Sequence, residues 1–163
     1  MARSEGFTLL ELLVVLVVLS TLAVLAFGYE REALARMEVE SAARRVLLGI
    51  ERGRLAAERQ GRPCALSLEA RGWRGPVSGS LPACEAVPLE LGEGVGAIGE
   101  VRLQHNLPAA VRFTSNGLLI DAGSVQVSHP ATALVRCVVV SLPLGITRVG
   151  LQNEAGCMPD PSL

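Results

Sequence analysis

A single carboxylate, that of Glu11, lies within a long run of uncharged, mostly apolar residues. Glu11 is the only charged residue in the run from Phe7 to Phe27. A charge in hydrocarbon costs about 3 kcal/mol on insertion scales, so Glu11 needs a partner or a purpose. A cut between Gly6 and Phe7 would create an α-ammonium four residues before Glu11, and these two charges attract strongly in apolar surroundings. The spacing therefore predicts that Glu11 neutralises such an ammonium, in its own chain or in a neighbouring one.

Four cysteines are the second group with chemistry of their own: Cys64, Cys84, Cys137 and Cys157. Their spacing contains no CxxC and no histidine at zinc-ligand distance, so an even set of this kind favours disulfides and an oxidising compartment. We favour Cys64 with Cys84 and Cys137 with Cys157, because each pair closes a local loop and would stabilise the fold by roughly 3 kcal/mol. The two other pairings, and four buried free thiols, remain alternatives.

Catalytic and cofactor motifs are weak. His129, Ser141 and Asp121 supply the residue types of a catalytic triad, but no GxSxG elbow accompanies them. Residues 94–99 match GxGxxG, yet residues 100–104 look like a strand where a dinucleotide site needs a helix. Acidic residues do not cluster as a calcium loop requires. The sequence therefore predicts no catalytic residue, no metal and no cofactor, and an enzyme behind a signal anchor stays as an alternative.

Composition narrows the class of partner. The chain has 163 residues, a formal net charge of -1 and 3% aromatic residues, and arginine is its only basic side chain apart from two histidines. Neither a basic surface for nucleic acid nor a platform for base stacking is indicated. The length suits one globular domain with an additional segment.

That additional segment is helical. Residues 7–28 would span about 30 Å as a helix, which is enough to cross a bilayer core. Residues 29–60 contain no proline and predict an amphipathic continuation that ends near Gly61. Glu32 with Arg36 and Glu40 with Arg44 have the spacing of surface ion pairs. The apolar positions recur at helical spacing: Val39, Ala43, Val46, Leu47, Ile50 and Ala57.

The remainder, residues 61–163, reads as a β-rich domain. Strands are predicted over 64–69, 101–103, 111–114, 124–128, 134–142 and 146–151. Asn116-Gly117 marks a tight turn, and residues 71–99 are expected to form variable loops. A helix followed by antiparallel strands is an α+β fold, in which the long N-terminal helix packs on an antiparallel sheet.

The segment Gly6-Phe7-Thr8-Leu9-Leu10-Glu11 resembles the leader and processing motif of type IV prepilins. The resemblance implies a leader at residues 1–6, cleavage after Gly6 by a prepilin peptidase, N-methylation of Phe7 and a role for Glu11 in subunit stacking. It also implies a pilin-like fold, anchored once in the inner membrane, with its C-terminal domain in the periplasm or in an extracytoplasmic filament. The implied partners are other pilins or pseudopilins, an inner-membrane assembly platform and membrane lipid.

The C-terminal part is similar to the GspH/FimT-type domain of minor pseudopilins and minor pilins. The residues that carry this likeness are 113–117 and 136–141, followed by Gly145 and Arg148. Together the two resemblances imply a structural subunit, not an enzyme, in a type II secretion or type IV pilus filament.

Besides the enzyme behind a signal anchor, two further alternatives stay open. A DNA-binding competence pilin would use Arg148, with Arg62, Arg71 and Arg74 as a small basic patch, but acidic residues balance these arginines and nucleic acid is not favoured. The other is a different role for the apolar run, either an ordinary signal peptide cut after Ala26 or a plain anchor.

Overall fold

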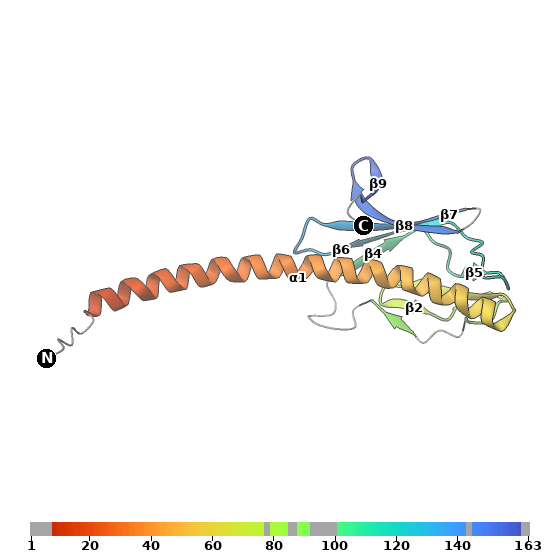
Figure 1. Cartoon of the computed structure of the whole chain (residues 1–163), viewed down its shortest axis with the longest axis horizontal. Coiled ribbons are helices and arrows are strands. Elements are labelled where there is room, and N and C mark those ends of the chain that lie inside the picture. Colours follow the sequence, from red (N-terminus) through yellow and green to blue (C-terminus); the bar gives the residue numbers. More distant parts are fainter. Residues whose placement is uncertain (1–7, 77–78, 85–87, 92–100, 143–144, 161–163) are drawn as a thin grey trace.

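A single helix forms the longest element of the protein. The computed structural model describes residues 8–76, 79–84, 88–91, 101–142 and 145–160, and of residues 25–29 it describes the backbone only. Helix α1 runs from Leu9 to Gln60 without a break. At 1.5 Å per residue its 52 residues extend about 78 Å, so its N-terminal half projects far beyond the rest of the chain (Figure 1).

Both ends of α1 have local causes. The side chain of Thr8 caps the start by accepting a hydrogen bond from the backbone N–H of Glu11 at 3.3 Å. At the other end Gly61 adopts φ 60°, a left-handed conformation that glycine reaches without strain, and its N–H donates to the carbonyl of Glu58. The predicted helix end near Gly61 is confirmed.

The remaining chain forms two antiparallel sheets, where the sequence predicted one. The first has the order β3-β2-β1-β5 and the second the order β4-β6-β7-β8-β9. The α+β class is therefore confirmed, and the single sheet is corrected to two. The strands are β1 (Cys64–Glu69), β2 (Gly72–Arg74), β3 (Leu89–Glu90), β4 (Arg102–His105), β5 (Val111–Phe113), β6 (Gly123–Ser128), β7 (Val135–Ser141), β8 (Ile146–Asn153) and β9 (Gly156–Pro159).

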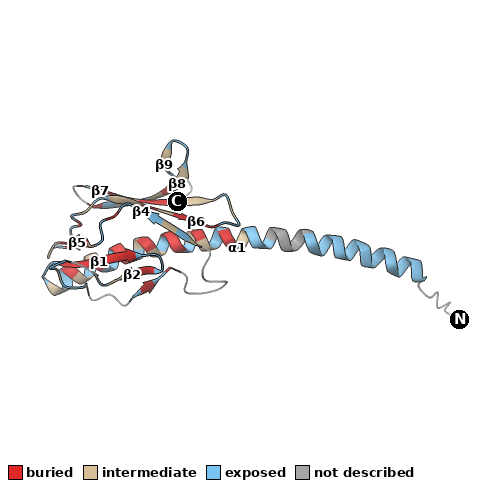
Figure 2. Cartoon of the chain, turned by 180° about the vertical axis from the view of Figure 1, so that it is seen from behind, coloured by how far each residue is buried: buried red, intermediate tan, exposed pale blue. Residues whose placement is uncertain are grey.

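The C-terminal half of α1 lies between the sheets, with β6, β7 and β8 on one side of it and β2 on the other (Figure 1). Buried residues on this half alternate with exposed ones, whereas the described side chains of the N-terminal half are exposed (Figure 2). The buried stripe consists of Ala35, Val39, Ala42, Ala43, Val46, Ile50 and Ala57, which includes most of the predicted apolar positions.

Two glycines let the first sheet approach the helix closely. A Cβ atom on Gly49 would lie 2.0 Å from Cδ1 of Trp73, and one on Gly53 would lie 2.6 Å from Cζ of Phe113. The indole Nε1–H of Trp73 donates to the carbonyl of Val46 at 3.1 Å, so this buried ring has its polar group satisfied. Gly49 and Gly53 are therefore packing points of the helix against the first sheet.

Strands β2 and β3 correct the expectation of variable loops over residues 71–99. Trp73 is 2% exposed and pairs with Leu89 in the sheet. A run of only two or three residues carries too little alternation to signal a strand, and it is the partner strand that makes it one.

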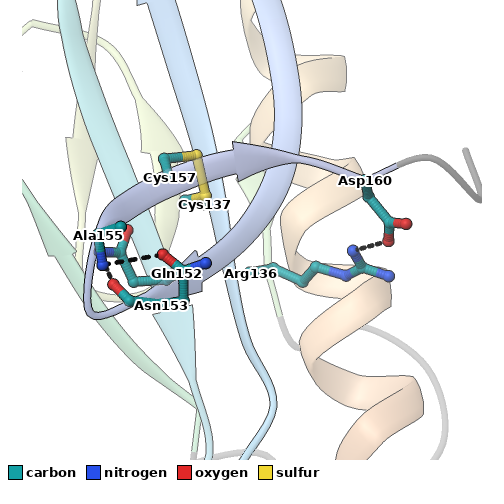
Figure 3. Close-up of a disulfide and its surroundings, with 7 residues drawn as sticks. All are labelled: Arg136, Cys137, Gln152, Asn153, Ala155, Cys157 and Asp160. Atoms are coloured by element: carbon teal, nitrogen blue, oxygen red, sulfur yellow. Dashed lines mark hydrogen bonds and ion pairs between the residues drawn. A yellow bond between two sulfur atoms is a disulfide. The ribbon is translucent and has the colours of Figure 1, made fainter.

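Two disulfides join Cys64 to Cys84 and Cys137 to Cys157, which is the pairing favoured from the local spacing. The second (Figure 3) connects β7 to β9, although β8 lies between these strands. Its Cα–Cα distance is 5.9 Å, against about 9.5 Å for two strand spacings in a flat sheet. Strand β9 therefore curls over β8 at Gly150, where a Cβ would lie 3.2 Å from Sγ of Cys157.

Candidate functional site

The N-terminal half of α1 presents an apolar surface that nothing in the described chain covers. Every leucine and valine from Leu9 to Val24 is exposed, with relative accessibilities between 48% (Val15) and 82% (Leu9). Such a surface is far larger than monomeric proteins in water tolerate, and it marks a surface for other molecules. Among the helices of the described residues, none is both long enough and apolar enough to cross a membrane.

Glu11 lies in the first turn of this exposed helix. The positive end of the helix dipole favours a carboxylate there. Within the described part of the chain its carboxylate makes no ion pair or hydrogen bond. Gly6 and Phe7, the residues of the predicted cleavage and methylation, lie outside the described residues. The pairing of Glu11 with an α-ammonium therefore stays a prediction.

A buried arginine joins the helix to the second sheet. Arg136 on β7 is 7% exposed. Its Nε donates to Oε1 of Glu40 at 2.7 Å, and its Nη2 and Nη1 reach Glu40 and Asp160 respectively. Burial alone would lower the pKa of Arg136, but hydrogen bonds to Asp160 and Glu40 and their negative charges raise it above its ordinary value. The guanidinium is therefore charged and ties α1, β7 and the C-terminal segment together. Figure 3 shows its contact with Asp160.

The contact of Arg136 with Glu40 corrects one predicted ion pair, that of Glu40 with Arg44. Glu32 and Arg36 pair at 2.7 Å, as their spacing predicts, but Glu40 is bound by Arg136 instead of Arg44. The physical reason is burial, because an unpaired guanidinium inside the fold costs several kcal/mol and a surface i,i+4 pair returns only about 0.5 kcal/mol. Sequence reasoning missed Arg136, although a lone arginine in an otherwise apolar strand is the signal that would have found it.

The three residues considered for a catalytic triad, His129, Ser141 and Asp121, do not come together. His129 is buried, with Nε2 3.3 Å from Oε2 of Glu38 on α1 and Nδ1 accepting the N–H of Ala131 at 3.1 Å. Ser128 pairs with Val135 at one end of the β6–β7 pair, whereas Ser141 closes β7 at the opposite end. The third residue, Asp121, is held by Arg112, and its Oδ1 lies 2.7 Å from Nη2. His129 thus serves the junction between helix and sheet.

The arginines considered for a nucleic-acid surface are dispersed. Arg148 is exposed on β8 of the second sheet, and Arg74 lies on β2 of the first. Arg74 also faces two carboxylates, Glu69 at 3.4 Å and Glu90 at 3.9 Å. Arg148 and Arg74 thus lie on different sheets, and Arg74 has carboxylate partners, so these two do not form the row of free cations that a phosphate backbone requires.

Comparison with known proteins identifies the N-terminal segment. Residues 1–27 match the family model described as the prokaryotic N-terminal methylation motif. No curated protein and no solved structure matches the chain. The matched segment contains Gly6, Phe7 and Glu11, and it includes the exposed apolar part of α1 from Leu9 to Val24. The chain therefore carries a prepilin-type N-terminus on a helix-plus-sheets body, which supports a type IV pilin-like precursor.

Proposed function

We propose that this protein is a structural subunit, a minor pseudopilin or minor pilin, of a type II secretion or type IV pilus filament. The observation that carries the proposal is the methylation motif over residues 1–27. The apolar part of the same segment supports this reading, because Leu9 to Val24 do not belong to the core of the folded domain. A surface of this kind has two natural environments, the hydrocarbon of a membrane and the apolar interior of a helical assembly.

In this proposal the leader is removed after Gly6 and the new terminus at Phe7 is methylated. The apolar helix holds the subunit in the inner membrane until an assembly platform extracts it. The helix then packs against neighbouring helices instead of lipid, so growth exchanges one apolar environment for another. Glu11 pairs with an α-ammonium and selects the axial register, since an unpaired charge in apolar surroundings is costly.

The minor-subunit assignment is supported by the same short segments that carry the sequence likeness. Residues 113–117 lead from the last residue of β5 into the tight turn after it, where the N–H of Thr114 donates to the carbonyl of Leu118. Residues 136–141 lie in β7, and Gly145 and Arg148 belong to the β7–β8 hairpin. The two sheets would then face the periplasm or the filament exterior and contact other subunits.

Intact mass and N-terminal sequencing of the chain recovered from its native membrane test the proposal. We expect a mature chain that begins at methylated Phe7. A chain that begins near Phe27 would indicate ordinary secretion, and an uncut chain would indicate a plain anchor; either result overturns the filament proposal.

A further inference from the structure

A groove runs between α1 and the edge of the second sheet formed by β8 and β9. Its volume is about 590 Å³, within the range of about 300–1,000 Å³ that ligand sites occupy. Four apolar residues line it: Ala43 and Leu47 from the helix, Val149 from β8 and Pro159 from β9. The groove is thus wide enough for several side chains and offers them an apolar lining.

Two arginines border this groove without partners. Arg44 on α1 and Arg148 on β8 both line it, both are exposed, and neither has an ion pair or hydrogen bond within the described part of the chain. The two carboxylates of the groove, Glu40 and Asp160, are already bound by Arg136. The unpaired charge that the groove offers to a ligand is therefore positive, and it is complementary to a carboxylate or another anion.

A second hollow, of about 510 Å³, continues the surface on the other side of Arg44. It shares Glu40 and Arg44 with the groove, and Met37 and Leu48 line it with 60% and 42% of their surfaces exposed. Met37 and Leu48 thus extend the exposed apolar surface along the helix face that carries Arg44, whereas Arg36 and Arg45 in the same hollow already have partners. This mixture is typical of a protein contact, where apolar area supplies affinity and charge supplies specificity.

Starting from the proposed filament role, we propose that this groove binds a segment of a neighbouring subunit in which carboxylates flank apolar side chains. The carboxylates would meet Arg44 and Arg148, and the apolar side chains would cover Leu47 and Val149. Arginine suits this role because its planar fork binds a carboxylate through two hydrogen bonds.

Other anions fit the groove less well. A nucleic acid backbone needs several cations in a row, and here two arginines stand next to two carboxylates. A lipid headgroup would have to reach Arg44, which follows Gly28 by 16 residues, about 24 Å along the helix axis. The apolar lining would also gain nothing from a phosphate.

Peptide selection on the full-length chain in detergent micelles tests the groove. A phage-displayed library of random dodecapeptides is the probe, and we expect enrichment of peptides in which Asp or Glu adjoins Leu, Ile, Val or Phe. A synthetic peptide of the enriched sequence should bind the double variant Arg44→Gln/Arg148→Gln at least about tenfold more weakly, because two arginine–carboxylate pairs are lost. The matched control is Arg52→Gln/Arg59→Gln, which removes two exposed helix charges outside both hollows and should bind within about twofold of the unchanged chain.

Several results overturn the proposal: no acidic and apolar enrichment, equal losses in both double variants, or unchanged binding by Arg44→Gln/Arg148→Gln. Displacement of the peptide by random-sequence duplex DNA, or by anionic phospholipid added as mixed micelles, at lower concentrations than free peptide would assign the groove to those ligands instead. Urea unfolding of each variant checks the fold. Thr147→Trp, which fills the groove without changing its charge, should also weaken binding. If only the groove proposal fails, N-terminal sequencing still finds a chain that begins at methylated Phe7. If the filament proposal fails, the sequenced chain begins elsewhere or is uncut.

Discussion

Glu11 differs from the other acidic residues of α1 in what surrounds it. Glu32 pairs with Arg36, and Glu40 is bound by Arg136, whereas no cation of the described residues reaches Glu11. The helix dipole favours a carboxylate in the first turn by about 0.5 kcal/mol. That is much less than the roughly 3 kcal/mol it costs to hold a charge in hydrocarbon. In the filament proposal, an α-ammonium closes this gap.

The variant Glu11→Ala should therefore be processed normally after Gly6 and still fail to assemble. We expect its amount in sheared filaments to fall roughly tenfold or more, because the α-ammonium it would meet is left unpaired in apolar surroundings. Immunoblots of membrane and filament fractions measure this ratio. Glu32→Ala removes the same charge from an exposed surface and should assemble normally. Full incorporation of Glu11→Ala would sink the charge-pairing account.

Asp121 provides a prediction about pH. Hydrogen bonds from the Arg112 side chain lower the pKa of Asp121, burial opposes this, and the backbone N–H and charge of Arg112 add to the lowering. A depressed folded-state pKa stabilises the fold above the unfolded pKa of about 3.9, and this stability is lost as the pH falls through the lower folded value. Urea unfolding from about pH 6 down to about pH 2 should thus show a flatter loss for Asp121→Asn than for the unchanged chain.

The control for this pH profile is Glu154→Gln, a change in an exposed turn where no hydrogen bond or ion pair of the side chain is recorded. Its profile should follow that of the unchanged chain. Identical profiles for Asp121→Asn and the unchanged chain would show that Arg112 does not stabilise the ionised carboxylate.

At the scale of elements, the sequence pattern predicted the features that depend on neighbouring residues, such as helix ends and strand bounds. The end of α1 at Gly61 follows from one residue's conformational freedom, and β1 was predicted with the bounds Cys64–Glu69 that the structure has. The division into two sheets was not predicted. It depends on pairings such as Leu66 with Val111, which are far apart in the sequence and leave no trace in periodicity.

The junction between α1 and β7 escaped sequence reasoning for the same reason. The spacing of Glu40 and Arg44 is visible in the sequence, but the arrival of Arg136 beside Glu40 is not. Asp160 also joins from the far end of the chain. The candidate site was therefore predictable at its N-terminal motif, which is a contiguous string, and not at the contacts that attach the helix to the sheets.

Replacing Arg136 with Met tests this junction. Glu40 and Asp160 would lose their shared cation, and removing one member of a buried ionic group costs about 3 kcal/mol or more. We expect the free energy of unfolding in urea to fall by about that amount. Arg112→Gln breaks a pair whose arginine side chain is 51% exposed, and it should lower the free energy of unfolding much less than the change at Arg136. Equal effects of the two changes would mean that burial does not distinguish these pairs.

At the scale of the whole molecule, each sheet has its own disulfide. Cys64–Cys84 closes the start of the first sheet, and Cys137–Cys157 draws β9 over β8 in the second. Each bond spans 20 residues of sequence. The C-terminal half of α1 lies between these two disulfide-linked sheets, and its buried stripe packs against both.

Removing one staple should loosen its own sheet. The double variant Cys137→Ser/Cys157→Ser should lose about 3 kcal/mol of unfolding free energy, as the chain-entropy model gives for a loop of this size. Urea unfolding under non-reducing conditions measures the loss, and Ser124→Ala on β6 serves as a mild control. A loss below about 1 kcal/mol would show that the curl of β9 is held by its strand pairing with β8 alone.

The continuity of α1 has a mechanical consequence. One uninterrupted helix joins Leu9 to Gln60, and only its second half is gripped by the sheets. Tension applied at the N-terminal end is transmitted along the helix axis, and the grip runs parallel to that axis from Ala35 to Ala57. The interlocked side chains then share the tension together instead of peeling apart one after another. Pulling on the N-terminal end of α1 should therefore move the whole domain without unfolding it.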